Sequence, residues 1–310
     1  MPLIDPTTLR ALLRPRRGRA LALIALHLGC WLGAAAAIAS TDIFLLKIPL
    51  WLLAASGVMG LIQLGHETWH HNLFRSRWAD RLFGEALSVL VGIAYLPLRH
   101  DHLAHHRWSR TPRDPDAYNA GRRSPGLLLL FYAVVALGLP LSLIYFNVLY
   151  PLQHFDRAAL RRHALVLLAY AAGYAALFAA LARNDLLGLA LEVWLVPILV
   201  ASPLNGLKSI ADHHANVWRG DRFHTATTAR SNRLVTFLWC GLNYHLDHHL
   251  FPHVPGYNLP ALHHHLRPAL LERGAPVFDS YLAVMLAALR AGPAIVPDAV
   301  PLVHLRRRSP

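Results

Sequence analysis

The feature that most constrains this chain is a set of apolar stretches, each long enough to cross a lipid bilayer. Four of them occupy residues 20–39, 43–64, 164–182 and 186–204. An apolar α-helix of about 20 residues spans the hydrocarbon core of a membrane. The chain as a whole is 55% hydrophobic and only 15% charged, which argues against a soluble protein. We therefore expect an all-α integral membrane protein with four transmembrane helices.

The short polar segments between these stretches predict how the helices pair. Residues 40–42 and 183–185 are tight polar turns, so each joins two spans into a hairpin. Two hairpins place the basic loops and all the histidine clusters on one face. Basic loops prefer the cytoplasm, so this face is expected to be cytoplasmic. A signal peptide is the alternative for the first stretch, but its length exceeds the roughly 7–15 residues of a signal-peptide core.

Two other apolar segments fit a simple span less well. Residues 83–98 are short and contain Glu85 and Pro97, so we expect them to lie at the interface or dip into the membrane. Residues 126–150 are long enough to cross, but Pro140 interrupts them and a basic segment follows. We expect a re-entrant or kinked pair of interfacial helices there. The chain is predicted to form one domain over 1–310, with a basic N-terminal segment (1–19) and a Pro/Arg-rich tail (292–310).

Charge and cysteine content further narrow the class of protein to which this chain can belong. The net charge is +13. We assign it to a membrane surface rather than to nucleic acid, because long apolar runs separate the basic patches. Arginine supplies nearly all of this charge, since Lys47 and Lys208 are the only lysines; this favours a bacterial source and hence a bacterial inner membrane. Cys30 and Cys240 alone provide neither a disulfide framework nor a zinc-binding cysteine pair.

Histidines are crowded into three short clusters: HETWHH at 66–71, HLAHH at 102–106 and HLDHH at 245–249. Residues three or four apart lie on one face of a helix, so the histidines within each cluster are expected to aim at a common point. Neutral imidazole is the commonest protein ligand for metals. Three clusters offer more ligands than the four that one tetrahedral ion takes. The sequence therefore predicts more than one metal ion, in a cavity near the membrane surface where helix ends converge.

These motifs resemble those of the membrane fatty acid desaturase superfamily over roughly residues 40–270. The similarity is strongest in HETWHH (66–71), HLAHHRWSRTPRDPD (102–116) and NYHLDHHLFPHVPGYNLPALH (243–263). The last segment is more similar to acyl-lipid and sphingolipid-type desaturases than to carotenoid ketolases. The resemblance implies a non-haem di-iron centre in a cytoplasmic histidine cap. The implied metal ligands are His66, His70, His102, His105, His106, His213, His245, His248 and His249.

The position of the ninth ligand departs from the family pattern. Many members carry Ala-Glu-His between the last span and the third cluster, whereas this chain has Ala211-Asp212-His213-His214. Either histidine fits, and His213 is the one we favour. Other polar residues near the ligands are expected to hydrogen-bond the imidazoles, position the motifs or hold water; surface charge is the alternative for each carboxylate. These neighbours are His71, His214, Glu67, Asp101, Asp212, Asp247, Asn243, Asp114 and Asp116. The histidines at 253 and 263–265 are expected to be non-ligands on a surface segment.

The resemblance implies the introduction of a double bond into a fatty acyl chain or related lipid with dioxygen as oxidant. Removing hydrogen from an unactivated methylene needs an oxidant that no side chain supplies, so a cofactor is required. The expected partners are the lipid or acyl substrate, membrane lipids, and a separate electron donor of the ferredoxin, cytochrome b5 or rubredoxin type. No nucleic-acid partner is expected.

Three alternatives remain at the level of sequence. A lipid, alkyl or carotenoid hydroxylase of the same superfamily would use the same motifs. Residues 66–70 also read His-Glu-x-x-His, the zinc-protease signature, although a protease leaves the other two clusters unexplained. A metal transporter would place ligands inside its spans, whereas these clusters lie outside them.

Overall fold

The computed structural model describes residues 3–74, 76–111, 113–115, 133, 137–213 and 221–291, the last five as backbone only. Within that part of the chain, four helical segments are long and apolar enough to cross a membrane. They are α2 (Arg17–Ala39), α3 (Phe44–Trp69), α8 (Arg157–Arg183) and the segment Leu187–His213, which comprises α9 (Leu187–Ala190), the π-helical turn η2 (Leu191–Leu195) and α10 (Val196–His213). The four spans expected from the sequence are therefore present as helices.

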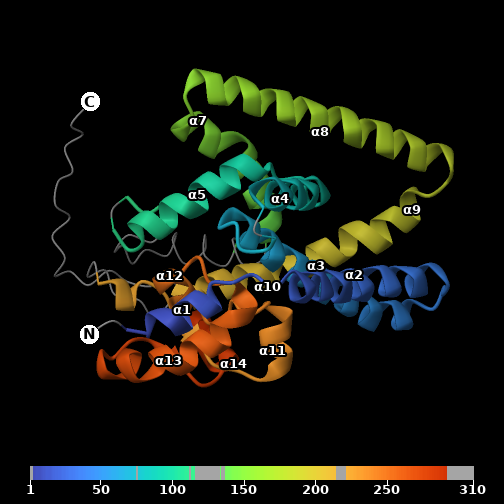
Figure 1. The fold of residues 1–310 in the computed structure, drawn as a ribbon. Helices are drawn as coiled ribbons and strands as arrows, with labels where there is room; N and C mark the ends of the chain where they lie inside the picture. Colours follow the sequence, from blue (N-terminus) through green and yellow to red (C-terminus); the bar gives the residue numbers. More distant parts are fainter. Residues whose placement is uncertain are drawn as a thin grey trace.

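Helices α2 and α3 lie side by side (Figure 1) because glycines allow their backbones to approach closely. A Cβ atom on Gly57 would lie 2.5 Å from the His27 carbonyl oxygen, and one on Gly60 would lie 2.1 Å from the His27 ring. Any larger residue would force the helices apart. Small residues at a contact are the usual means of packing helices in lipid, where burial of apolar surface supplies no driving force.

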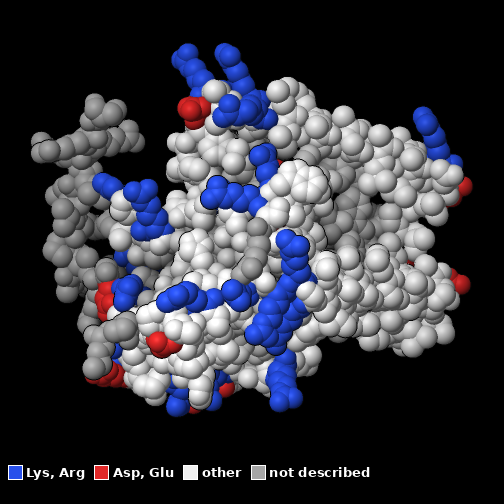
Figure 2. Space-filling model, in the orientation of Figure 1, with Lys and Arg blue, Asp and Glu red and all other residues white. Residues whose placement is uncertain are grey.

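Helix α8 shows most directly that the protein needs an apolar surrounding. Its apolar window has a mean hydropathy of 2.1, and none of it is buried inside the protein. A helix of this kind is stable only where lipid covers its side chains. Figure 2 shows the matching charge distribution: Lys and Arg gather on the left and middle of the view, while the right-hand part, built from the long helices, is almost free of charge except at its tips.

Residues 83–98, expected to form one interfacial segment, instead belong to two helices. Helix α4 (Arg77–Val91) and helix α5 (Tyr95–Trp108) meet at an angle of 110°. Gly92 ends α4 in the left-handed conformation, with φ of 76°, which glycine adopts without steric penalty. The Asn147 side chain fixes the corner by accepting a hydrogen bond from Ala94 N and donating one to Gly92 O. The bend redirects the chain so that α5 carries the second histidine cluster toward the first.

The segment 126–150 lies partly outside the described residues. Its described part is helical over 137–144 and continues through the π-helical turn η1 (Tyr145–Leu149) into α7 (Tyr150–His154). The 292–310 tail lies outside the described residues. The basic N-terminal segment contacts the rest of the protein, because Arg16 N donates a 2.6 Å hydrogen bond to the Tyr257 hydroxyl.

The remaining elements form a cap at one end of the long helices. They are α1 (Pro6–Leu12), η3 (Arg222–His224), β1 (Thr228–Ala229), α11 (Arg233–Leu238), α12 (His245–Leu250), η4 (Gly256–Asn258), α13 (Leu259–Glu272), β2 (Val277–Phe278) and α14 (Tyr281–Ala291). Strands β1 and β2 pair in parallel over two residues, a small departure from the all-α expectation. Leu246 of α12 packs in the cap core with Leu259, Leu262 and Leu266 of α13, and all four are fully buried. This core holds α12 in place against the ends of the long helices.

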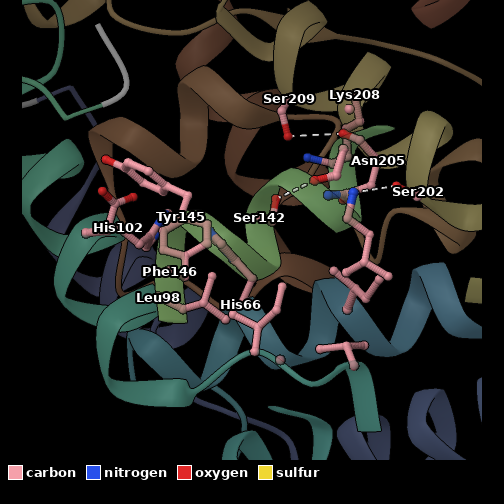
Figure 3. A pocket seen from close by; sticks show the side chains of 18 of the residues that line it. His66, Leu98, His102, Ser142, Tyr145, Phe146, Ser202, Asn205, Lys208 and Ser209 are labelled. Atoms are coloured by element: carbon pink, nitrogen blue, oxygen red, sulfur yellow. Dashed lines mark hydrogen bonds between the residues drawn. The ribbon is translucent and has the colours of Figure 1, made fainter. Parts of the chain in front are cut away.

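Helices α3, α4, α5 and α10 and residues 138–149 enclose a cavity of about 770 Å³ (Figure 3). Most of its wall is apolar, with Leu87 from α4, Leu98 from α5 and Ile198 from α10. Histidines occupy part of the same wall; those lining it are His66, His102, His105, His213 and His245. The fold therefore joins an apolar chamber to the histidine-rich ends of the helices.

Candidate metal centre

The nine histidines identified in the sequence come from four helix ends and meet in one region. His66 lies in the last turn of α3 and His70 caps it, His102, His105 and His106 lie on α5, His213 ends α10, and His245, His248 and His249 lie on α12. The rings are buried or nearly so.

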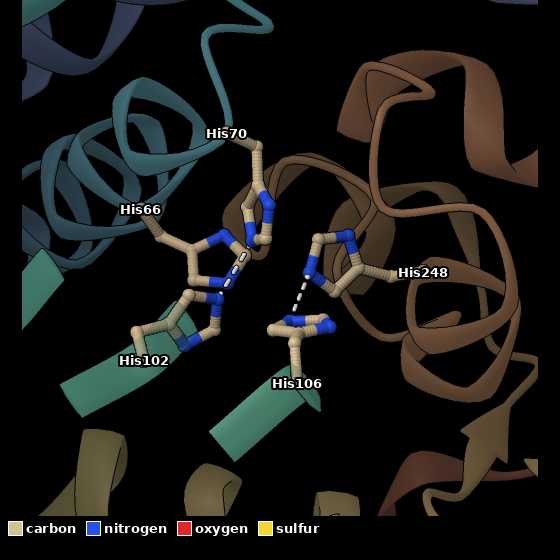
Figure 4. A group of neighbouring side chains, drawn as sticks. All are labelled: His66, His70, His102, His106 and His248. Atoms are coloured by element: carbon tan, nitrogen blue, oxygen red, sulfur yellow. Dashed lines mark hydrogen bonds between the residues drawn. The ribbon is translucent and has the colours of Figure 1, made fainter. Parts of the chain in front are cut away.

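Five of the histidines form a first cluster (Figure 4). These are His66, His70, His102, His106 and His248, and one ring nitrogen of each lies within 4.8 Å of the others. The Nε2 atoms of His70 and His102 are 2.7 Å apart, and those of His106 and His248 are 3.1 Å apart. Both ring nitrogens of His66 are buried without a hydrogen-bond partner among the described residues. Such atoms call for a ligand that the protein itself does not supply.

The other four histidines form a second cluster beside the first. One ring nitrogen each of His105, His213 and His249 lies within 4.8 Å of the other two. His245 joins them, since its Nε2 is 3.1 Å from His213 Nε2 and 3.2 Å from His249 Nε2. The structure thus brings all nine predicted histidines together, in two groups.

The expectation that each cluster of the sequence aims at one point is wrong for the second and third. His102 and His106 belong to the first group, but His105 between them belongs to the second; His245 and His249 belong to the second group, but His248 belongs to the first. The reason is the helical repeat of 3.6 residues per turn, or about 100° per residue. Residues i and i+4 lie about 40° apart, whereas i+3 and i+4 lie about 100° apart. A His-x-x-His-His motif on a helix therefore serves two adjacent centres.

The donor set fits metal ions. Two nitrogens bound to one ion at about 2.1 Å and at right angles lie about 3.0 Å apart, close to the separations of 2.7–3.2 Å between paired Nε2 atoms here. Burial, the largest cause, lowers the pKa of His70, His245 and His248 well below that of an ordinary histidine. These rings are consequently neutral, which is the form that binds a metal.

Hydrogen bonds to the far ring nitrogens orient the second cluster. His105 Nδ1 lies 2.8 Å from an Asp114 carboxylate oxygen, and the other oxygen accepts a 2.8 Å bond from Arg110 N. His213 Nδ1 lies 3.0 Å from the Thr225 carbonyl oxygen, and His249 Nδ1 lies 3.2 Å from the Ser109 hydroxyl. Such contacts fix the tautomer and orientation of a metal ligand. Asp114 was predicted in this environment. Ser109 and Thr225 were missed, because Ser109 contacts a histidine 140 residues away in the sequence and Thr225 acts through its backbone carbonyl, which every residue type has.

Two of the predicted neighbours lie beside imidazoles but form their hydrogen bonds elsewhere. Glu67 Oε1 is 3.6 Å from His66 Nδ1, while Oε2 accepts a 2.7 Å hydrogen bond from Gly256 N. Asp212 Oδ2 is 3.7 Å from His245 Nδ1 and only 2.5 Å from Lys208 Nζ. Glu67 therefore links α3 to η4.

Asp247 and Asn243 hold the third cluster in place through contacts with neighbouring segments. Asp247 accepts a 2.6 Å hydrogen bond from the Thr228 hydroxyl and lies 3.1 Å from His263 Nδ1. Asn243 donates a 2.8 Å hydrogen bond to Ala229 O. His263 is only 4% exposed, so the expectation that it lies on a surface segment is wrong: the helical repeat of α13 turns it toward Asp247.

The last predicted neighbours occupy different places. Asp101 is buried and lines the cavity. His71 follows the end of α3 in the left-handed conformation, with φ of 59°, and its ring contacts Arg99 rather than either histidine group. His214 and Asp116 lie outside the described residues.

Comparison with known proteins agrees with this geometry. The family model for fatty acid desaturases matches residues 43–281, which include α3 and all nine clustered histidines. The chain belongs to the fatty acid desaturase family. It is also similar to the sn-1 oleoyl-lipid 12-desaturase of Synechocystis sp., with 27% identity over 258 residues, covering 72% of this chain and 70% of that protein.

Family membership and the four apolar helices make this desaturase-family protein an integral membrane oxidoreductase of lipid metabolism. Its two histidine groups can bind metal ions, and its cavity is of the size and apolar character that small-molecule sites have.

Proposed function

We propose that the protein is a dioxygen-dependent, di-iron desaturase that introduces a double bond into the acyl chain of a lipid. The observation that carries this proposal is the junction of an apolar cavity of about 770 Å³ with two adjacent groups of buried histidines. An apolar chamber binds a hydrocarbon chain, and imidazole ligands suit iron.

The first iron would be held by the five-histidine group and the second by the four-histidine group. When bound, the two irons supply the dioxygen activation and the oxidising power that hydrogen abstraction from a methylene requires. His66 and His102 belong to the first group, His105, His213 and His245 to the second, and all five line the cavity. A chain in the cavity would therefore lie beside both irons.

The protein's own side chains would orient the substrate and exclude water. Leu87, Leu98 and Ile198 on the cavity wall offer an acyl chain dispersion contacts and no hydrogen bonds. Gln63 and Asn205 also line the cavity, with Gln63 Nε2 3.4 Å from Asn205 Oδ1. The similarity to an acyl-lipid desaturase supports an acyl chain esterified to a membrane lipid as substrate.

A hydroxylase of the same superfamily would use the same histidines and cavity, and the product distinguishes it. The zinc-protease hypothesis is less well supported. It requires Glu67 as a general base toward a metal-bound water, whereas Glu67 Oε2 accepts its hydrogen bond from Gly256 N. A transporter is also less well supported, because the histidines gather at helix ends rather than in the middle of the spans.

For the membrane, we propose two hairpins, α2–α3 and α8–α10, with the histidine cap on the cytoplasmic side of a bacterial inner membrane. The concentration of Lys and Arg away from the long apolar helices (Figure 2) supports this orientation. A separate carrier of the ferredoxin, cytochrome b5 or rubredoxin type would then deliver electrons from the cytoplasm.

Metal analysis of the purified protein tests this function. We expect about two iron ions per chain, and lipid analysis of cells expressing the protein should show a new unsaturated acyl chain. His248→Ala and His105→Ala, one from each group, should lose iron and product while still inserting into the membrane. His265→Ala, an exposed histidine outside both groups, is the control. One zinc ion per chain, or hydroxylated lipid as the product, would contradict the proposal.

A further inference from the structure

The first histidine group has a side that does not face the cavity. His66 and His102 line the cavity, but His70 does not. The His70 ring instead faces His253, with 6.5 Å between ring centroids. His70 is 5% exposed and His253 is exposed. An imidazole at the surface therefore lies in direct proximity to a buried ring of the first group.

Two arginines lie in the same part of the surface as His253. Arg77 is exposed at the start of α4, and half-buried Arg99 has Nη2 3.3 Å from His71 Nε2. Arg77 lies one helical turn before Asp80 on α4, and Asp80 Oδ2 is 3.9 Å from His71 Nδ1, so the start of α4 lies beside this ring. No ion pair joins Arg77 or Arg99 to a carboxylate in the part of the chain that the structure describes.

A buried carboxylate lies on the inner side of this group. Asp80 Oδ2 lies 3.9 Å from His71 Nδ1, but the residue is fully buried and its other oxygen accepts a hydrogen bond from Phe74 N. Two arginine charges outnumber this one carboxylate, so the group formed by Arg77, Arg99, His71 and His253 is electropositive. We call these four residues the basic face.

We propose that the basic face is the docking surface for an acidic one-electron carrier protein. This inference rests on the proposed function and identifies where its electron donor binds. Charge complementarity would steer and orient the carrier, as it does for other oppositely charged partners. Docking at His253 would place the carrier next to the first iron without obstructing the cavity that holds the lipid.

The stoichiometry of desaturation requires two such docking events per turnover. Two C–H bonds of the acyl chain break and one C=C bond forms, which releases two electrons and two protons. Reduction of one dioxygen to two waters takes four electrons and four protons. The carrier supplies the remaining two electrons, one at a time, and the solvent supplies the remaining two protons.

Binding of a redox-inert carrier tests the proposal. The probe is a gallium-substituted acidic plant-type ferredoxin, titrated onto the full-length, iron-loaded protein in nanodiscs of zwitterionic lipid at low salt. Arg77→Glu and His253→Glu should each weaken binding by about tenfold or more, and the wild-type affinity should fall steeply with salt. The matched control is Arg161→Glu, an equal charge change at an exposed arginine of α8, which should alter binding less than about twofold.

The outcomes separate this proposal from the one on which it rests. Gallium carries no electron, so binding is measured without turnover, and a failure of the desaturase proposal would appear as missing iron or product in the wild type. Equal loss of binding in Arg77→Glu and Arg161→Glu would overturn the docking site. The docking site would also be overturned if Arg77→Glu left carrier binding unchanged but weakened binding of anionic phosphatidylglycerol vesicles. The basic face would then bind lipid headgroups.

Discussion

Replacement of Asp114 by asparagine should weaken metal binding at the second histidine group and leave the first group intact. Among the described residues, His105 Nδ1 and Arg110 N each donate a hydrogen bond to this carboxylate, both at 2.8 Å. Asparagine keeps the size and shape of the side chain but offers only one acceptor oxygen. One of the two donors must then face an amide NH₂ group.

The magnitude follows from two independent considerations. A buried donor left without an acceptor costs about 1–3 kcal/mol. Loss of the group that hydrogen-bonds a metal-bound histidine typically costs about 10- to 100-fold in metal affinity, which corresponds to about 1.4–2.7 kcal/mol. Both ranges agree, so we expect metal at the second group to bind about 10- to 100-fold more weakly.

Graded chelator challenge followed by metal analysis measures this loss. In Asp114→Asn, about one of the two metal ions per chain should be released at a chelator concentration at least tenfold lower than in the wild type. Asp156→Asn is the matched control, because Asp156 caps α8 with a 2.7 Å hydrogen bond from Ala159 N and is exposed. Identical release curves for Asp114→Asn and the wild type, or simultaneous loss of both ions, would refute the assignment of Asp114 to one group.

Three further predictions test the packing, the cavity and the boundary of the metal site. Gly84→Ala should destabilise the protein in detergent by about 1–3 kcal/mol and so lower its thermal midpoint, because the new Cβ would lie 2.3 Å from the Tyr95 ring. Gly173→Ala is the control and should not lower the midpoint, because its Cβ meets nothing within 4 Å. Equal shifts in the two variants would contradict the packing at Gly84. Leu98→Trp should fill part of the cavity and reduce desaturated product at least about tenfold with iron content unchanged, so full activity would show that the chain binds elsewhere. His71→Ala should retain both metal ions, and loss of either would make His71 a ligand.

Much of this site was predictable from local sequence, because helix periodicity acts over a few residues. The four apolar spans could be located by length and composition, although the helices run further than the apolar runs: α3 continues to Trp69, so it includes His66 and Glu67. All nine clustered histidines were also identified. The α4–α5 corner was not, because the geometry at Gly92 depends on the Asn147 side chain from a distant segment.

The sequence by itself determined that apolar helices must carry these imidazoles at a membrane, because helix length and residue spacing are local properties of the chain. Only the tertiary structure decided how the imidazoles divide. His105 and His106 are neighbours in sequence, yet they belong to different groups, since successive residues on a helix point about 100° apart. The partners on either side, His213 of α10 and His70 at the end of α3, are brought there by the packing of distant helices. Convergence of this kind has no signature in a single stretch of sequence.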